Sequence, residues 1–252
     1  MCPKSSTPPW ERKVPAKRYY IPHPLKAQSA VEIEGDEAHH LLRVMRAQAG
    51  DRVELVNGRG QCAEAHVEKV DSKRQTATLE ISAVISVETL PFGLVLAQAL
   101  PRPTKLDFII EKATELGATE IRLFPAERSE IKDLSENKIG RLQSLAIASM
   151  KQCGRLFLPR ILLAEPISRW SSLPFPAFFG DLEPDAAFFS AAWQAPEVGV
   201  LFVVGPEAGF TEEELTALRR LGAQGVRLHD NILRTETAGI VALSLMSHWK
   251  PK

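Results

Sequence analysis

The sequence predicts an α/β protein in two parts: a β-rich part at the N-terminal end and a longer part in which strands and helices alternate. Residues 200–204 form an unbroken apolar run rich in β-branched side chains, which is typical of a strand buried on both faces. Thr211 and Glu214 form a capping box, which predicts a helix beginning at Thr211. Short strand-like runs fill residues 18–87, whereas strand and helix patterns alternate from residue 93 onward.

Length and composition are those of an ordinary globular protein. The chain has 252 residues, of which 44% are apolar and 25% are charged, enough for one large domain or two modest ones. No apolar run approaches the ~20 residues of a membrane span, and the N-terminus lacks the apolar core of a signal peptide. Cys2, Cys62 and Cys153 are widely spaced, so we expect neither a disulfide framework nor a zinc site, and a reducing, cytoplasmic compartment.

The charge is balanced overall but uneven along the chain. The formal net charge is zero, whereas residues 1–30 carry six basic side chains against one acid, and residues 137–164 carry five against none. Each cluster alone is typical of a solvated helix face. Two such clusters on a neutral protein favour local contact with phosphate groups. We interpret residues 1–17, which contain four prolines, as a disordered basic tail.

The N-terminal elements predict a small β-barrel over residues 18–88. An Asn57-Gly58 pair predicts a hairpin between two strands, and Asp36 is the expected cap of the one helix in this part. Arg43 and Arg46 lie three residues apart on that helix and are candidate phosphate contacts. The expected strands are 18–21, 30–33, 52–56, 61–70 and 76–87, and the expected helix is 36–47.

Residues 89–252 predict a mostly parallel sheet with helices on both faces. Residues 88–91 read as a linker, and Gly117 is a typical glycine after the end of a helix. The expected strands are 93–100, 121–124, 161–163, 176–179, 200–204 and 225–228, and the expected helices are 104–116, 135–153, 211–221 and one from Thr235 onward. Two loops then follow neighbouring strands at their carboxyl ends, where open α/β sheets bind ligands.

These two loops carry the functional information. Residues 205–209 read Gly-Pro-Glu-Ala-Gly, which has neither the spacing of a dinucleotide-binding turn nor that of a P-loop. Alone, this stretch indicates only a turn. Residues 234–237 read Arg-Thr-Glu-Thr directly before an apolar helix, which is more polar character than a helix cap requires.

Together the two stretches resemble the SPOUT RNA methyltransferases, most closely the family that methylates N3 of a uridine in 16S ribosomal RNA. That family has a Gly-Pro-Glu-Gly-Gly loop and, after a helix, a Leu-Arg-Thr-Glu-Thr segment; here they correspond to residues 205–209 and 233–237. The resemblance extends from about residue 18 to residue 249. Further matching segments are Lys105-Leu-Asp-Phe, residues 111–117, Glu127-Arg128, residues 152–155 and residues 40–46.

The resemblance implies a fold and an activity. It implies a C-terminal trefoil knot in residues 89–252 and a PUA-like RNA-binding domain in residues 18–88. The implied activity is methylation of N3 of a uridine in small-subunit ribosomal RNA with S-adenosyl-L-methionine as cofactor and without a metal. A homodimer is also implied, and the helix after Thr235 is apolar nearly all round with small residues such as Gly239, as a helix covered on several faces would be.

The resemblance also implies the site residues. For catalysis we expect a cation that stabilises the uracil anion, with Arg234 and Arg155 as candidates and Glu236 as a proton acceptor or orienting group. Glu236 is equally well explained as a first-turn helix acid, and Arg155 as a phosphate contact. The expected cofactor-binding residues are Val204, Gly205, Pro206, Glu207, Gly209, Leu228, His229, Ile232, Leu233, Thr235 and Thr237. The expected RNA-binding residues are Arg18, Arg43, Arg46, Lys105, Arg128 and Arg155.

Two departures from the family pattern leave alternatives open. Ala208 stands where the family has a second loop glycine, which would be strained if the position required a positive φ. Residues 229–231, His-Asp-Asn, replace a segment that in the family carries a positive side chain. The alternatives are an RNA-binding relative without catalysis and a methyltransferase acting on another RNA uridine.

Overall fold

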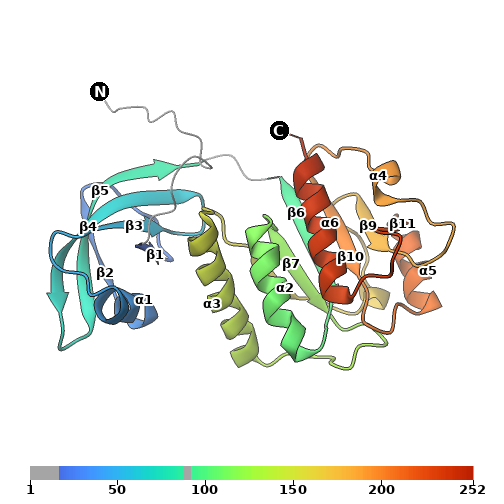
Figure 1. The fold of residues 1–252 in the computed structure, drawn as a ribbon, viewed down its shortest axis with the longest axis horizontal. Coiled ribbons are helices and arrows are strands. Elements are labelled where there is room, and N and C mark those ends of the chain that lie inside the picture. Colours follow the sequence, from blue (N-terminus) through green and yellow to red (C-terminus); the bar gives the residue numbers. More distant parts are fainter. Residues whose placement is uncertain (1–16, 88–91, 252) are drawn as a thin grey trace. The chain divides into compact units, whose positions relative to one another are not determined.

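The computed structural model describes residues 17–87 and 92–251, which form two compact units (Figure 1). The first unit contains residues 17–87 together with the segment Met150–Leu158. The second contains residues 92–149 and 159–251. The predicted basic tail, apart from Lys17, and the predicted linker 88–91 lie outside the described residues.

The first unit is built on a five-stranded sheet in the order β1-β3-β4-β5-β2. Strand β1 pairs in parallel with β3, whereas the other neighbours pair antiparallel. The sheet covers a core that includes Tyr19, Leu41, Leu55 and Leu79, each 0% exposed. Its strands are β1 (Arg18–Tyr20), β2 (Ser29–Ile33), β3 (Arg52–Val56), β4 (Gln61–Asp71) and β5 (Thr76–Ser86), close to the predicted ranges.

The helix of this unit differs from the prediction at both ends. Helix α1 (Gly35–His39) follows Glu34, and no side chain caps it, so the expected cap at Asp36 is wrong. Asp36 lies inside the first turn, where its negative charge interacts favourably with the positive end of the helix dipole. The chain then widens into a π-helix, η2 (His40–Val44), which leaves Leu41 in the core. Arg46 follows at a positive φ of 49° and ends the helical segment.

The second unit contains six parallel strands in the order β11-β9-β10-β6-β7-β8. The predicted parallel sheet is therefore confirmed. The two central strands are buried over their whole length, and Gln98 is the one polar side chain in either of them. The strands are β6 (Gly93–Ala99), β7 (Glu120–Phe124), β8 (Arg160–Leu163), β9 (Ala177–Gly180), β10 (Gly199–Val204) and β11 (Gln224–Val226).

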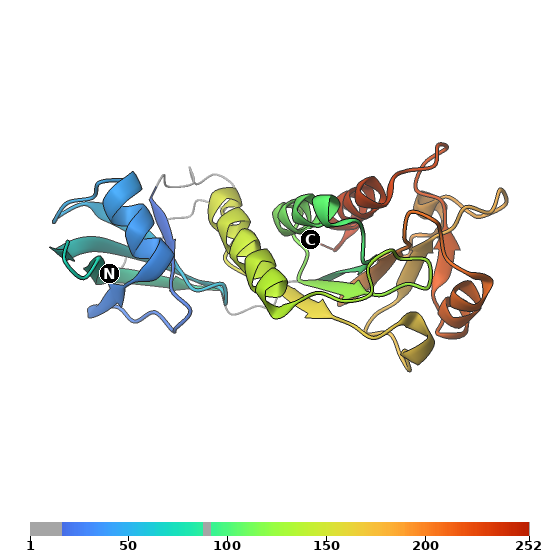
Figure 2. The same cartoon turned by 90° about the horizontal axis from the view of Figure 1, so that it is seen from below.

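Helices cover both faces of this sheet. Helices α2 and α6 lie side by side on one face, and α5 lies on the other face next to a short 3₁₀-helix, η3 (Figure 2). The predicted capping box at Thr211 and Glu214 is present, and α5 begins at Glu212, directly after the capping residue Thr211. The helices are α2 (Pro103–Glu115), α3 (Glu136–Cys153), α4 (Phe189–Ala192), α5 (Glu212–Arg220), α6 (Thr235–Trp249) and η3 (Ile167–Arg169); α4 and η3 are not predicted by the sequence.

The sheet order brings three loops to one edge of the sheet. Strand β10 lies between β6, which precedes it by a long stretch of chain, and β9, which precedes it directly. The loops that leave β9, β10 and β11 therefore gather at one end of the sheet. The trefoil knot stays a prediction. Within residues 17–87 and 92–251, none of the helices combines the length and the apolar character that a membrane span requires.

Candidate functional site

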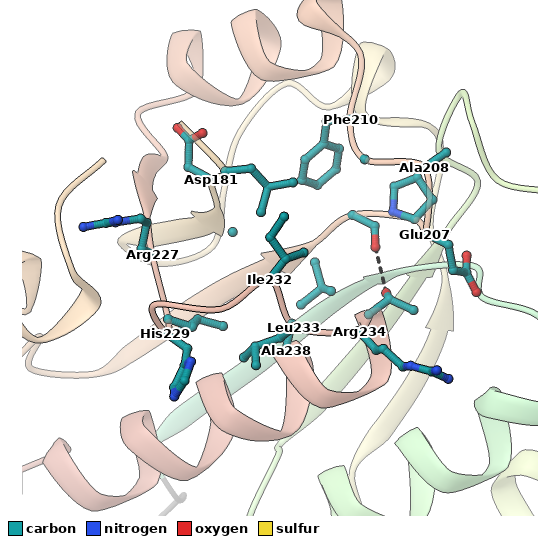
Figure 3. Close-up of a pocket in the computed structure, with 18 of the residues that line it drawn as sticks. Asp181, Glu207, Ala208, Phe210, Arg227, His229, Ile232, Leu233, Arg234 and Ala238 are labelled. Carbon is teal, nitrogen blue, oxygen red and sulfur yellow. Dashed lines mark hydrogen bonds between the residues drawn. The ribbon is translucent and has the colours of Figure 1, made fainter. Parts of the chain in front are cut away.

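A cavity of about 800 Å³ lies at the carboxyl ends of β9, β10 and β11 (Figure 3). This is within the range of small-molecule sites. Its walls come from the loop after β9 (residues 180–184), the loop after β10 (residues 204–210) and the segment between β11 and α6 (residues 226–234). The first turns of α2 and α6 complete it. Phe210, Ile232 and Leu233 project toward the same space, and Ile232 is 80% exposed at the mouth (Figure 3).

The loop after β10 is held in a tight turn. The backbone N–H of Gly209 donates to the carbonyl of Pro206 at 2.9 Å, and Gly209 has a positive φ of 73°. Ala208 is not among the residues with positive φ, so its methyl group brings no backbone strain. Arg128 Nη1 donates to the carbonyls of Ala208 (3.1 Å) and Phe210 (3.2 Å). A distant arginine thus fixes the outer half of this loop.

The inner half of the loop is tied to α6 by a buried hydrogen-bond chain. The Thr235 hydroxyl donates to the Gly205 carbonyl at 2.7 Å and accepts from Gln98 Nε2 at 2.8 Å. Gln98 is 0% exposed, and its Oε1 has no hydrogen-bond partner among the described residues. A side chain at Gly239 would place its Cβ 3.0 Å from that oxygen. The small residue predicted at this point of α6 therefore makes room for the buried amide.

The loop after β9 forms a wall that the sequence reasoning missed. Asp181 is 8% exposed and accepts from Arg219 Nη2 and from the backbone N–H of Glu183, both at 3.1 Å. Its backbone N–H donates to the Val226 carbonyl at 3.0 Å. A Cβ at Gly225 would overlap the Asp181 carboxylate. That glycine is the one sequence signal for this wall, because it permits the close approach of β11 and the loop.

The side of the cavity next to α2 is charged. Lys105 Nζ lies 2.5 Å from Glu236 Oε1, and both residues line the cavity. Burial alone would raise the pKa of Glu236, but its bonds to Lys105 and to its own backbone N–H, and the charges of Lys105 and Arg234, outweigh burial and lower this pKa. Glu236 is therefore an ionised partner of a lysine. Arg234 is exposed and extends on the same side as Glu207 (Figure 3).

Most predicted cofactor residues line this cavity. Of the eleven, Thr237 does not, because it is exposed on the outer side of the first turn of α6. Of the predicted catalytic residues, Arg234 and Glu236 line the cavity, whereas Arg155 belongs to the segment Met150–Leu158 of the first unit. Burial lowers the pKa of the half-buried Arg155. Arg155 is therefore not one of the residues that line the cavity.

The predicted RNA-binding residues lie in three different settings. The Arg18 side chain is 8% exposed and forms an ion pair with Glu54 inside the first unit, which leaves little of it available for RNA. Arg43 and Arg46 are exposed, and Arg43 Nε donates to Gln75 at 3.0 Å. Lys105 and Arg128 line the cavity of the second unit. RNA contact by these residues and by Arg155 stays a prediction.

The cavity fits a small molecule with an apolar ring and charged ends. Its walls offer apolar side chains for a ring, the backbone of residues 204–209, and the carboxylate of Glu207 for a cationic group. Among the residues that the structure describes, no three His, Cys, Asp or Glu side chains gather closely enough to hold a metal ion. The apolar walls, the loop backbone and the acidic side chain suit S-adenosyl methionine, which has an adenine ring and cationic ammonium and sulfonium groups.

Comparison with known proteins agrees with this geometry. A family model described as an RNA methyltransferase domain matches residues 88–247, and one described as an RNA methyltransferase PUA domain matches residues 33–80. The chain is 30% identical over 247 residues to the ribosomal RNA small subunit methyltransferase E of Bacillus subtilis, covering 92% of this chain and 96% of the relative.

Solved structures of similar proteins cover nearly the whole chain. Ribosomal RNA small subunit methyltransferase E of Neisseria gonorrhoeae, solved with S-adenosyl methionine bound, has a TM-score of 0.81 at 26% identity and covers 93% of this chain and 98% of that one. A protein of Legionella pneumophila, also solved with this cofactor bound, has a TM-score of 0.80 at 25% identity and covers 94% of this chain and 98% of that one.

Proposed function

Because this chain belongs to the RNA methyltransferase family, we propose that it methylates N3 of a uridine in small-subunit ribosomal RNA with S-adenosyl methionine. The family matches confirm the resemblance that residues 205–209 and 233–237 carry, and they confirm a PUA-like N-terminal unit. One observation supports the proposal most. The cavity is built from the same two stretches that carry the resemblance.

The residues that would hold the cofactor follow from the cavity. The apolar side chains of Phe210, Leu228 and Ile232 offer surfaces for the adenine ring, and backbone groups of residues 204–209 offer hydrogen bonds. The bound cofactor supplies an activated methyl group on a sulfonium. The protein must then position the uridine and favour loss of its N3 proton.

Arg234 is the proposed contact to the uracil. It lines the cavity directly before α6, and its guanidinium is permanently charged. As the N3 proton leaves, negative charge develops on the uracil oxygens. A hydrogen bond from Arg234 to one of these oxygens therefore becomes stronger in the transition state than in the ground state. Arg155, which lies outside the lining of the cavity, is proposed as an RNA contact instead.

The first unit is proposed to bind RNA, and the second to bind the cofactor. Arg43 and Arg46 are exposed basic side chains of the PUA-like unit. Contacts from these side chains to phosphate groups would bind the RNA without reading its base sequence. We also propose a cytoplasmic homodimer formed through the second unit. Ile240, Val241 and Leu245 of α6 are only half-buried within one chain, so a partner could cover them.

Two measurements test the proposed function. Calorimetry should show S-adenosyl methionine binding, and methyl transfer from labelled cofactor should go to small-subunit ribosomal RNA. Arg234→Ala should bind the cofactor with little change but lower the single-turnover rate by roughly 10²-fold, the effect of removing one preorganised donor. Cofactor binding without any transfer to RNA would favour the alternative of an RNA-binding relative without catalysis.

A further inference from the structure

Two helices that begin at the cavity bring a lysine and a glutamate together. Lys105 lies in the first turn of α2 and Glu236 in the first turn of α6, and the two helices pack side by side. Their side chains meet at 2.5 Å although 131 positions separate them in the sequence. The Lys105 side chain is 35% exposed and that of Glu236 is 11% exposed. The pair is therefore sheltered on the carboxylate side and open on the ammonium side.

The carboxylate of this pair is poorly suited to accept the N3 proton. The pKa of Glu236 is lowered, and a base is most effective when its pKa lies near the working pH. One of its two carboxylate oxygens, Oε1, is also in short contact with Lys105. Glu236 is better placed to hold the lysine in one position, since a buried ionised carboxylate restricts the flexible lysine stem.

We propose that Lys105 is a catalytic residue whose ammonium group donates to a carbonyl oxygen of the target uracil, and that Glu236 is its positioning residue. This inference rests on the proposed function and adds a second cation to it. In the reaction the N3–H bond breaks and its proton passes to water, which leaves a negative charge shared by N3 and the neighbouring oxygens. The N3–carbon bond then forms as the carbon–sulfur bond of the sulfonium breaks, so both charges are neutralised. Lys105 stabilises the anion between these events.

Lys105 and Arg234 differ in the contacts that hold their side chains. Within residues 17–87 and 92–251, no hydrogen bond or ion pair of the Arg234 guanidinium is found, and this side chain is exposed. Lys105 is fixed by Glu236, so it meets the requirement that a charge-stabilising donor be in place before the reaction. Uracil has one carbonyl oxygen on each side of N3, and the two cations therefore need not compete for the same atom.

The test compares pH–rate profiles of the full-length protein. Lys105→Met removes the charge but keeps most of the stem, and Glu236→Gln keeps the shape of the positioning residue. Single-turnover methyl transfer is measured at saturating cofactor and RNA from about pH 6 to about pH 9. Lys112→Met is the matched control, because Lys112 lies on the same helix, pairs with Glu111 and Glu115, and does not line the cavity.

The proposal predicts a shifted profile. Lys105→Met should be roughly 10²-fold slower near neutral pH and should approach the wild-type rate as the pH rises, because alkali replaces the lost help in forming the N3 anion. Glu236→Gln should shift the profile in the same direction by less, and the double variant should resemble Lys105→Met alone. Lys105→Arg should keep a profile near that of the wild type. Cofactor affinity by calorimetry should be unchanged in all of them.

Three results would overturn the proposal. One is an unshifted profile for Lys105→Met. Another is weaker RNA binding with a normal rate at saturation and a smaller dependence of binding on salt, which would make Lys105 a phosphate contact. The third is a Lys105→Met variant that loses cofactor affinity, which would place Lys105 in the cofactor site. If wild type and Lys112→Met both fail to transfer methyl groups, the proposed function itself fails.

Discussion

Replacing Thr235 by valine should weaken both the fold and the cofactor site. The Thr235 hydroxyl links the amide of Gln98 to the Gly205 carbonyl at the start of the cavity loop. Valine has nearly the same shape, so the packing of this buried position is kept. The change therefore removes the hydroxyl from the chain of hydrogen bonds and leaves the volume of the side chain nearly unchanged.

The expected loss of stability is about 2 kcal/mol. A buried group left without a partner costs about 1–3 kcal/mol. The partly buried Gly205 carbonyl loses its bond to the hydroxyl, whereas Gln98 Nε2 keeps a 3.3 Å contact with the Ala99 carbonyl, so the loss lies within this range and not at its upper end. For a protein of this size the melting temperature should fall by roughly 4–8 °C. The loosened Gly205 should also weaken cofactor binding.

Urea unfolding and calorimetry measure the two effects, and Thr237→Val is the control. Thr237 is exposed and does not line the cavity, so its replacement should change stability by less than about 0.5 kcal/mol and leave cofactor binding intact. Equal stability and equal cofactor binding of the two variants would show that the Thr235 hydroxyl does not support the loop. Loss of cofactor binding in Thr237→Val instead would show the same.

Three further changes have outcomes that the structure defines. Gly225→Ala would force a methyl group against the Asp181 carboxylate, and we expect a loss of about 1–3 kcal/mol in urea unfolding, whereas Gly180→Ala, which meets open space, should be neutral. Arg128→Ala removes two hydrogen bonds to the cavity loop and should weaken cofactor affinity in calorimetry; an unchanged affinity would show that the loop holds its shape alone. Burial, with the charges of Glu37 and Asp51, raises the pKa of Tyr19 from 10.0 to about 12. Its neutral form therefore stabilises the fold fully below pH 10, and this contribution is lost as the pH rises toward about 12; Tyr19→Phe should flatten the alkaline part of the stability curve, and an identical curve would contradict this assignment.

The regular elements of the second unit could be predicted because their signals are local. The apolar run at 200–204, the capping box at Thr211 and the glycine after α2 each determine their own element. The order of strands then places the two motif loops at one edge of a parallel sheet. The family resemblance rests on these same loops, so most of the residues that line the cavity could be predicted from the sequence.

The remaining site residues depend on contacts between distant parts of the chain. The loop after β9 becomes a wall only because β11 pairs with β9, and no periodicity in the sequence reveals that pairing. Arg18 looks like an exposed basic residue until Glu54 on the parallel neighbour β3 is placed beside it. Likewise, the Lys105–Glu236 pair arises from two helices packed together, and neither residue alone indicates the other.

The modified nucleosides of small-subunit ribosomal RNA report most directly on the proposed methylation. The RNA is purified from cells that lack this gene and treated with the protein and S-adenosyl methionine, and its nucleosides are identified by mass spectrometry. One uridine should gain a methyl group at N3, and Arg234→Ala should restore far less of it in the same time. A methyl group on another atom or another class of RNA, or no methylation by a protein that binds the cofactor, would contradict the proposed function.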